Sequence, residues 1–479
     1  MNAAYGVHRA VTRHHHRPPG AARHLSDASV VMIAVAEVTG AWLGWMAVAT
    51  AALVAIFARL TKLAVACCVV AALLGGVLAN RAWHESTPRT LGAYTGWARL
   101  VGDPAPFDSA LRATLQIEGE RFDAWLYGGA KRKLAAHQSG EYVWVDGVRA
   151  RHTASSARRA QVRHVVGRFE AEVVGDIVPG SALDLAGNRV RHQLRHSAEA
   201  TMSPDDAALF TGLVLGDDAR QPTWLIDDFR ASGLSHLTAV SGQNVAFVLA
   251  AALPLLRRLR PWGRWVATVG LIGWFMALTR FEPSVLRAGV MAMLASTSFV
   301  LGRQSTPARL LALAIIVLVA ADPLLVWSVG FWLSVGATAG VCVVGPWLHP
   351  RLPGPVWVRL PLAVTVGAQV GVALPSVLVF GRLPFVSLPA NLAAVPVAGF
   401  VMLYGLPAGL LASWLPGPLQ SVVMLPCGAG TRWVATVARL AARVEPPPAW
   451  SAACWAVAVV ALLAWWWHRS RAAPARVPI

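Results

Sequence analysis

The stretch SGLSHLTAVSGQNVAFVLA, at residues 232–250, opens a long apolar run but holds His236, Ser241, Gln243 and Asn244 close together. A polar group left unpaired in hydrocarbon costs several kcal/mol, so these side chains must face other helices or a water-filled cavity. The glycine beside them favours a break in the helix, and irregular backbone at membrane depth is tolerated only inside protein or along such a cavity. Helix packing is the simpler alternative, because small and polar residues also join membrane helices.

The composition supports a membrane location for this run. The chain has 479 residues, of which 56% are hydrophobic and 14% charged, whereas soluble domains carry about 25% charged residues. Several apolar runs reach about 20 residues, enough to cross a hydrocarbon core of ~30 Å. We therefore predict a polytopic α-helical membrane protein. The net charge of +18 is carried mainly by arginine, which suits phosphate contacts and the cytoplasmic flanks of spans.

Changes in composition along the chain predict six segments. They are a disordered basic tail (1–27), N-terminal membrane helices (28–80), an inserted β domain (81–201), amphipathic surface helices (202–233), a polytopic membrane domain (234–467) and a short basic tail (468–479). The apolar region at 28–58 is long for one span and short for two, and its flanking charges favour two. That count places both tails in the cytoplasm and the β domain outside it.

Alternating apolar residues identify the strands of the β domain. The pattern occurs in ALRATLQIEG (110–119), DAWLYG (123–128), EYVWVDGVRAR (141–151) and FEAEVVGDIV (169–178). Apolar side chains at every second position, bounded by Gly and Asp, are typical of half-buried strands. Several short strands within about a hundred residues predict a small all-β barrel, and an OB-like barrel fits this length best.

Polar residues in later spans extend the polar group of the opening stretch. Arg287 lies in one apolar segment, while Gln369 and Asn391 lie in two segments interrupted by proline. An ionisable residue within a span indicates function, although Arg287 near a span end could also extend its side chain to the interface. A path with an arginine and neutral hydrogen-bonding groups would suit an anion.

The sequence offers no recognisable catalytic centre. A nucleotide-binding P-loop needs Lys followed by Ser or Thr, and Lys62, Lys131 and Lys133 are followed by Leu, Arg and Leu. The helical zinc motif HExxH is also missing from the sequence. We therefore expect a protein that is not an enzyme and that uses no cofactor and no metal ion.

Four stretches resemble a known family in the same order along the chain. GLSHLTAVSGQNVA (233–246) resembles the ComEC competence signature Gly-Leu-x-His-Leu-Leu-Ala-(Ile/Val)-Ser-Gly-Leu-His-Val-Gly. FTGLVLGDD (210–218), ADPLLVWSVGFWLSVGATAG (321–340) and the Gln…Pro…Asn-Leu…Pro segment at 369–399 resemble further family landmarks. Asn244 stands where the family has its second histidine, so any protonation role of that imidazole cannot be carried over.

The resemblance implies a channel that moves single-stranded DNA across the inner, cytoplasmic membrane during natural transformation. The expected channel-lining residues are His236, Ser241, Gln243, Asn244, Arg287, Gln369 and Asn391. Expected partners are single-stranded DNA, membrane lipid, a separate cytoplasmic ATPase and a DNA receptor. Many members carry a metallo-β-lactamase-like nuclease domain, whose His-x-His-x-Asp-His motif is missing here, so a separate nuclease is also expected. The alternative is a transporter or flippase of another anionic or lipid-linked substrate.

The family's OB-like domain is thought to engage DNA, which assigns a role to a basic stretch of the β domain. Six arginines and no acid lie between residues 147 and 169, namely Arg149, Arg151, Arg158, Arg159, Arg163 and Arg168. We expect them to contact phosphates, against the alternative of a solvated basic loop. Trp125, Tyr127, Tyr142 and Trp144 suit base stacking, although a position in the barrel core is favoured for most of them.

Overall fold

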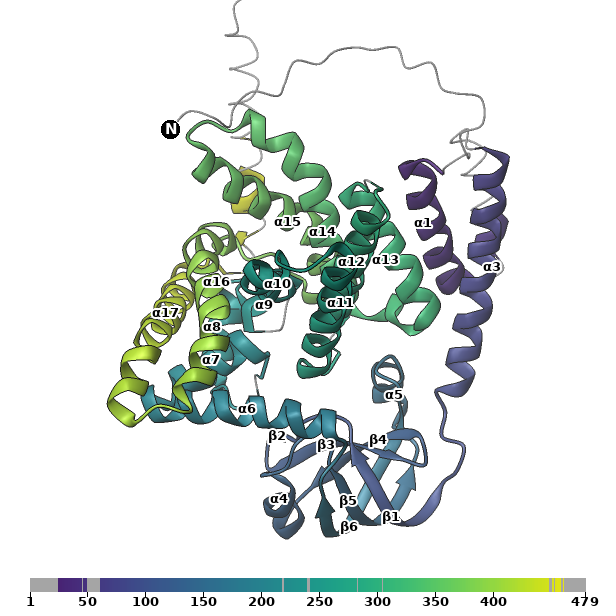
Figure 1. The fold of residues 1–479 in the computed structure, drawn as a ribbon. Coiled ribbons are helices and arrows are strands. Elements are labelled where there is room, and N and C mark those ends of the chain that lie inside the picture. The colour runs from purple at the N-terminus through teal and green to yellow at the C-terminus, as the bar shows by residue number, and fades with distance from the viewer. Residues whose placement is uncertain are drawn as a thin grey trace, which may run out of the picture.

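The structure is a computed structural model that describes residues 25–460 apart from 45, 50–60, 218, 239–241, 282, 304, 448–449, 452 and 458–459. The predicted tails, except for residues 25–27, and Ser241 lie outside the described residues. Figure 1 shows a large helical body with a small β-sheet domain at one end.

Apolar helices make up most of the described chain. Four of them are long and apolar enough to cross a membrane: α3 (Lys62–Glu85), α14 (Val329–Leu348, extended to Arg351 by a short 3-10 turn), α15 (Val356–Phe380) and α16 (Ser387–Ala412). Shorter or more polar helices are α1 (Asp27–Leu43), α10 (Gly242–Leu256), α11 (Pro261–Leu278), α12 (Pro283–Val300), α13 (Pro307–Ala321) and α17 (Gly417–Val444). These helices agree with the predicted helical membrane architecture.

Glycines set the closest helix crossing, between α14 and α15. A Cβ atom added at Gly371 would collide with the carbonyl oxygen of Gly336, and one added at Gly340 would collide with that of Gly367. Small residues let membrane helices approach until their backbones touch. The segments GATAG (336–340) and GAQVG (367–371) predict such packing from the sequence, and the structure confirms it.

The β domain is a closed barrel with one additional short strand. Its strands are β1 (Gly92–Leu100), β2 (Ala105–Phe107), β3 (Ala110–Ile117), β4 (Glu120–Leu126), β5 (Tyr142–Ala150) and β6 (Val165–Val178). The order is β1-β5-β6-β4-β3-β2, and β1 also pairs with β3, which closes five strands into a ring. The β4–β6 pair is parallel and the other pairs are antiparallel.

Side chains fill the interior of this barrel. Leu100, Leu115, Ile117 and Phe122 have no exposed surface, and Phe169 is 1% exposed. They belong to a hydrophobic cluster drawn entirely from the β domain, whereas the largest cluster of the helical body contains none of the barrel strands. The two parts therefore have separate apolar cores.

The segment boundaries differ from those expected at several places. Residues 81–85 continue α3, two short helices, α4 (Gly128–Leu134) and α5 (Ala154–Gln161), join the strands, and residues 182–201 form α6 (Ala182–Thr201). The β domain is therefore mixed rather than all-β. Helix α6 begins with a capping box between Ser181 and Asp184 and packs against α7, α16 and α17 (Figure 1).

The two predicted surface helices at 202–233 are present as α7 (Pro204–Leu215) and α8 (Thr223–Ala231), followed by the single turn α9 (Ser235–Thr238). Helix α7 is buried from Ala207 to Leu215, so the expectation that it lies at a surface is wrong. Its apolar residues reach all around the helix, because it is enclosed by α6, α16 and α17.

Candidate functional site

A large cavity extends from the barrel into the helical body. Its volume is about 2470 Å³, well above the ~300–1,000 Å³ that is usual for small-molecule sites. The wall includes Arg99 of β1, Arg280 after α11, Arg287 of α12, Gln369 of α15 and Asn391 of α16. The dimensions therefore suit a polymer or another extended ligand.

Most of the predicted lining residues lie on this wall. His236, Gln243, Arg287, Gln369 and Asn391 all line the cavity, although they come from five different elements of the chain. The structure thus brings together residues that the sequence separates by up to 155 positions, counted as 391 minus 236.

The prediction that Asn244 lines the cavity is wrong. It is 3% exposed, lies outside the cavity wall, and its Nδ2 donates a hydrogen bond of 3.3 Å to the carbonyl oxygen of Leu213 in α7. Successive helical residues point about 100° apart because a turn contains about 3.6 residues. Gln243 therefore faces the cavity, while Asn244 faces a neighbouring helix.

Arg287 places a positive charge deep among the helices. It is 7% exposed, and its Nε donates a 2.7 Å hydrogen bond to Ser334 Oγ of α14. A Cβ atom added at Gly242 would lie 3.1 Å from Nη2, so this glycine allows α10 to begin against the guanidinium. No carboxylate of the described residues lies within ion-pair distance of Arg287. In the described chain its guanidinium therefore donates to neutral groups, Ser334 and Met291.

Neutral amides and hydroxyls continue the polar wall on α15 and α16. Gln369 Nε2 donates to Ser387 Oγ at 2.8 Å, and Ser387 Oγ donates to the carbonyl oxygen of Pro384 at the same distance. Asn391 Oδ1 is buried without a hydrogen-bond partner among the described residues. Because a buried polar atom without a partner costs ~1–3 kcal/mol, this oxygen is suited to accept a hydrogen bond from water or a ligand.

Arginines outnumber acids on the described wall. The seven arginines are Arg99, Arg121, Arg163, Arg230, Arg280, Arg287 and Arg382, and the two acids are Asp184 and Asp322. A cavity of one charge sign with low-dielectric sides concentrates ions of the opposite sign. The wall therefore favours an anion.

Carboxylates moderate this charge at the barrel end. Four wall arginines make ion pairs: Arg99 with Asp184 (2.9 Å), Arg163 with Asp123 (3.1 Å), Arg230 with Asp227 (3.1 Å) and Arg280 with Asp103 (3.0 Å). His164 Nε2 also contacts Asp322 Oδ2 at 2.8 Å, which joins the barrel to the turn after α13. The cationic field is thus moderate rather than strong at this end.

The six arginines expected to contact DNA do not form one uniform face. Arg163 lines the cavity. Arg149 pairs with Glu118 at 2.7 Å and Arg168 with Glu170 at 3.0 Å. The guanidinium of Arg158 lies 5.3 Å from the centroid of the Trp83 ring, and Arg151 and Arg159 are exposed. Arg163 also pairs with Asp123. Both Glu118 and Asp123 belong to the β3–β4 hairpin, which is distant in sequence from the basic stretch. A local stretch without acids therefore does not predict a surface without acids.

The aromatic residues of the barrel also differ from expectation. Tyr127, Tyr142 and Trp144 are 61%, 40% and 38% exposed, so the prediction that most of these rings lie in the core is wrong. Trp144 packs edge-on against Trp97, its partner across the β1–β5 pair, with ring centroids 5.5 Å apart. These rings remain available for contacts with a partner.

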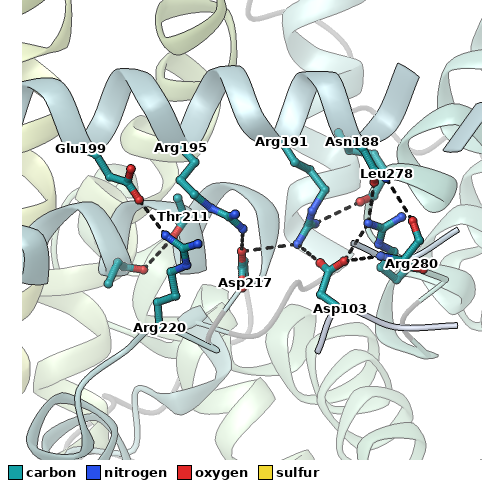
Figure 2. A network of polar contacts seen from close by, with 12 residues as sticks. Asp103, Asn188, Arg191, Arg195, Glu199, Thr211, Asp217, Arg220, Leu278 and Arg280 are labelled. Carbon is teal, nitrogen blue, oxygen red and sulfur yellow. Dashed lines mark hydrogen bonds and ion pairs between the residues drawn. The ribbon is translucent and has the colours of Figure 1, made fainter. Parts of the chain in front are cut away.

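A polar network along α6, shown in Figure 2, joins the barrel to the helical body. Asn188, Arg191, Arg195 and Glu199 are three or four residues apart, which places them on one helix face. Arg191 lies 2.9 Å from Asp103 and 3.6 Å from Asp217, and Arg195 lies 2.6 Å from Asp217. Our reading of the sequence missed this network, although the spacing of its α6 members was a visible signal.

Asp103 has three partners in this network. Its carboxylate accepts from Arg191, from Arg280 and from the backbone nitrogen of Ser139. Burial acts to raise the pKa of Asp103, but the two guanidiniums and the Ser139 hydrogen bond outweigh it and hold the pKa below the ordinary value of 3.8. Asp103 is therefore charged near neutral pH.

Comparison with known proteins assigns the chain to a family. The family model described as Competence protein matches residues 213–470, which is more than half of the chain. The chain belongs to the competence protein family. It is also similar to the uncharacterized protein YcaI of Escherichia coli (27% identical) and to ComE operon protein 3 of Bacillus subtilis (26% identical).

These similarities cover only parts of the relatives. The alignments span 54% and 46% of this competence protein but 35% of YcaI and 28% of ComE operon protein 3, so the chain spans about a third of the length of these curated relatives. No solved structure matches it with significance. The matched residues 213–470 contain the predicted lining residues from His236 to Asn391, whereas the barrel strands, which end at Val178, and α6 lie outside them.

Proposed function

We propose that this competence protein is a channel that moves single-stranded DNA across the cytoplasmic membrane during transformation. The observation that carries the proposal is the cavity of about 2470 Å³ whose described wall has seven arginines and two acids. Membership of the competence family supports a role in DNA uptake, and apolar helices of membrane-spanning length support a membrane location.

The chemistry of the wall fits a moving polyanion. Bringing a bare phosphate charge into low dielectric is prohibitive, so the path must stay hydrated and moderately positive. Conduction also requires weak, repeated sites, because strong ones would hold the strand in place. The unpaired charge of Arg287, with amides at Gln243, Gln369 and Asn391, meets both requirements.

The barrel would receive the strand on the outer side of the membrane. Closure of five strands, with α4 between β4 and β5, supports an OB-like barrel, a fold that binds oligonucleotides in other proteins. The exposed Arg151 and Arg159 would contact phosphates, and the exposed Tyr127 and Tyr142 would stack on bases.

Other proteins would complete the pathway. The described residues show no arrangement that we recognise as a nucleotide-hydrolysing site, so a cytoplasmic ATPase would pull the strand and a DNA receptor would deliver it. A separate nuclease would remove the second strand. These partners remain part of the proposal.

The test is transformation of a naturally competent strain that lacks its own channel, rescued by this chain. Arg287→Gln should lower the transformation frequency at least about tenfold, because a hydrogen bond between a phosphate and a charged donor contributes ~1.5–3 kcal/mol. Arg287→Lys keeps the charge and should retain more activity. Normal transformation by Arg287→Gln at equal expression would remove Arg287 from the path. Deletion of this protein from its own host that caused an envelope or lipid defect and left transformation normal would favour a flippase instead.

A further inference from the structure

Arg280 occupies an exceptional position at the barrel end of the cavity. It lies in the turn between α11 and α12, where Arg280 and Phe281 both have positive φ angles, 59° and 57°. Such angles are unusual for residues with a Cβ atom and persist where surrounding contacts fix them. Here the contacts are made by the Arg280 side chain, which also lines the cavity.

The guanidinium of Arg280 is only partly used by the protein. Nη2 donates to Asp103 Oδ1 at 3.0 Å and to Asn188 Oδ1 at 2.8 Å, while Nε is buried without a partner in the described chain. Arginine has five N–H donors in a planar fork that fits carboxylate and phosphate oxygens alike. Arg280 therefore retains donor capacity next to a cavity that favours anions.

Asp103 can leave Arg280 without losing all of its partners. Its other oxygen accepts from Arg191 Nη2 at 2.9 Å, and Oδ1 also accepts from the Ser139 backbone at 2.8 Å. Arg191 is 3% exposed, whereas the Arg280 side chain is 18% exposed. An incoming anion would therefore reach Arg280, while Arg191 keeps the carboxylate.

We propose that Arg280 is a phosphate-binding site at the barrel end of the cavity, and that the Asp103 carboxylate occupies it when no strand is bound. The ligand is a phosphodiester of the strand, so this inference rests on the proposed function. Each phosphate that binds Arg280 displaces Asp103, and the carboxylate returns when the phosphate moves on. Asp103 thus weakens phosphate binding at the entrance and keeps the strand mobile.

The site shares its cavity wall with Arg287. Arg280 lies in the turn before α12, which begins at Pro283, and Arg287 lies in the second turn of that helix. The helix rises by about 6 Å between Pro283 and Arg287. A phosphate released from Arg280 therefore has a second arginine on the same wall.

Binding of a fluorescent oligothymidine to the full-length chain in zwitterionic lipid discs tests the proposal. Asp103→Asn should tighten binding about tenfold, equivalent to 1.4 kcal/mol, because the internal competitor is removed. Asp206→Asn is the matched control: it makes the same charge change on α7, where Asp206 pairs with Arg432 away from the cavity, and it should leave the affinity unchanged. Arg280→Gln should weaken binding and abolish the tightening by Asp103→Asn in the double variant.

Asp103→Ser removes the same carboxylate and should give the same tightening if Asp103→Asn folds poorly, which helical circular dichroism would reveal. Unchanged or weaker binding by both Asp103 variants relative to Asp206→Asn would show that Asp103 only tethers the barrel, and would overturn the inference alone. Failure of the unmodified chain to bind the oligonucleotide would overturn the proposed function as well.

Discussion

Three arginines at the barrel end of the cavity and Arg287 at its deep end are held in opposite ways. At the barrel end, Arg99, Arg163 and Arg280 each pair with a carboxylate. At the deep end, Arg287 is fixed by the Ser334 hydroxyl, and no carboxylate of the described residues pairs with it. The difference shows that the same side chain can be paired with a carboxylate at one end and held by a neutral hydroxyl at the other.

The surroundings explain this difference. The barrel and the helices have separate apolar cores, and polar contacts such as Asp103 with Arg191 and Arg280, and His164 with Asp322, join them. The deep end is surrounded by helices whose backbones touch at glycines. Close packing fixes a side chain without a counter-charge, whereas a polar interface of this kind permits relative movement.

The largest expected effect is a loss of stability at the crossing of α14 and α15. Gly371→Val places a side chain against the Gly336 carbonyl, where even a Cβ atom collides, and should destabilise the protein by more than about 3 kcal/mol. Thermal unfolding monitored in detergent, together with the yield of monodisperse protein, measures this loss. Gly270→Ala in α11 is the control, because its Cβ atom would meet open space. Equal stability of the two variants would contradict the role assigned to the α14–α15 crossing.

A smaller effect is expected for two neighbouring residues of α10, Asn244, which packs against α7, and Gln243, which lines the cavity. Asn244→Leu leaves the buried carbonyl of Leu213 without its donor and should lower stability by ~1–3 kcal/mol. Gln243→Leu changes the cavity wall instead and should lower DNA uptake with little change in stability. Unfolding and transformation are measured for both variants. If Asn244→Leu reduced uptake at wild-type stability, the distinction between the two neighbours would be wrong.

The smallest effect concerns pH at the barrel end. Burial acts to raise the pKa of Asp103 and of Asp184. Arg191 and Arg280 nevertheless hold the pKa of Asp103 below the ordinary 3.8. Ser181 and Arg99 do the same for the pKa of Asp184. Carboxyl groups of lowered pKa stabilise the fold above the unfolded pKa and lose that contribution as the pH falls through the folded value. Hydrogen exchange at the β1–β2 loop should therefore stay constant from about pH 8 to about pH 5, after correction for the intrinsic rate.

Salt provides the complementary measurement at the same junction. Raising the ionic strength to about 1 M shortens the Debye length to ~3 Å, so exchange in this loop should increase modestly. Exchange in α14 and α15 should not change, because glycine packing carries no charge. A salt effect of equal size in both regions would remove the contrast between the two ends.

Sequence patterns predicted those features that depend on local spacing. Alternation located β3 to β6, and apolar runs located the long helices, because both follow from side-chain periodicity. Polar residues within apolar runs located Gln243, Arg287, Gln369 and Asn391 on the wall. The direction in which Asn244 points could not be predicted, because it depends on the position of α7.

Pairing between distant residues was also beyond sequence reasoning. Asp123 pairs with Arg163 across 40 positions, and Asp103 pairs with Arg280 across 177. Such contacts are set by the closure of the barrel and by its placement against α6 and α11. The sequence of the basic stretch therefore shows how many arginines it has, but not which of them are paired with carboxylates in the fold.

The filled interior of the barrel determines where a strand can travel. Leu100, Leu115 and Phe122 leave no solvent-exposed surface inside the ring, so a nucleic acid cannot thread along the barrel axis. The outside of the barrel, by contrast, supplies Arg99, Arg121 and Arg163 to the cavity wall. On the proposed route, a strand would therefore pass beside the barrel, between its outer surface and the helices that line the rest of the cavity.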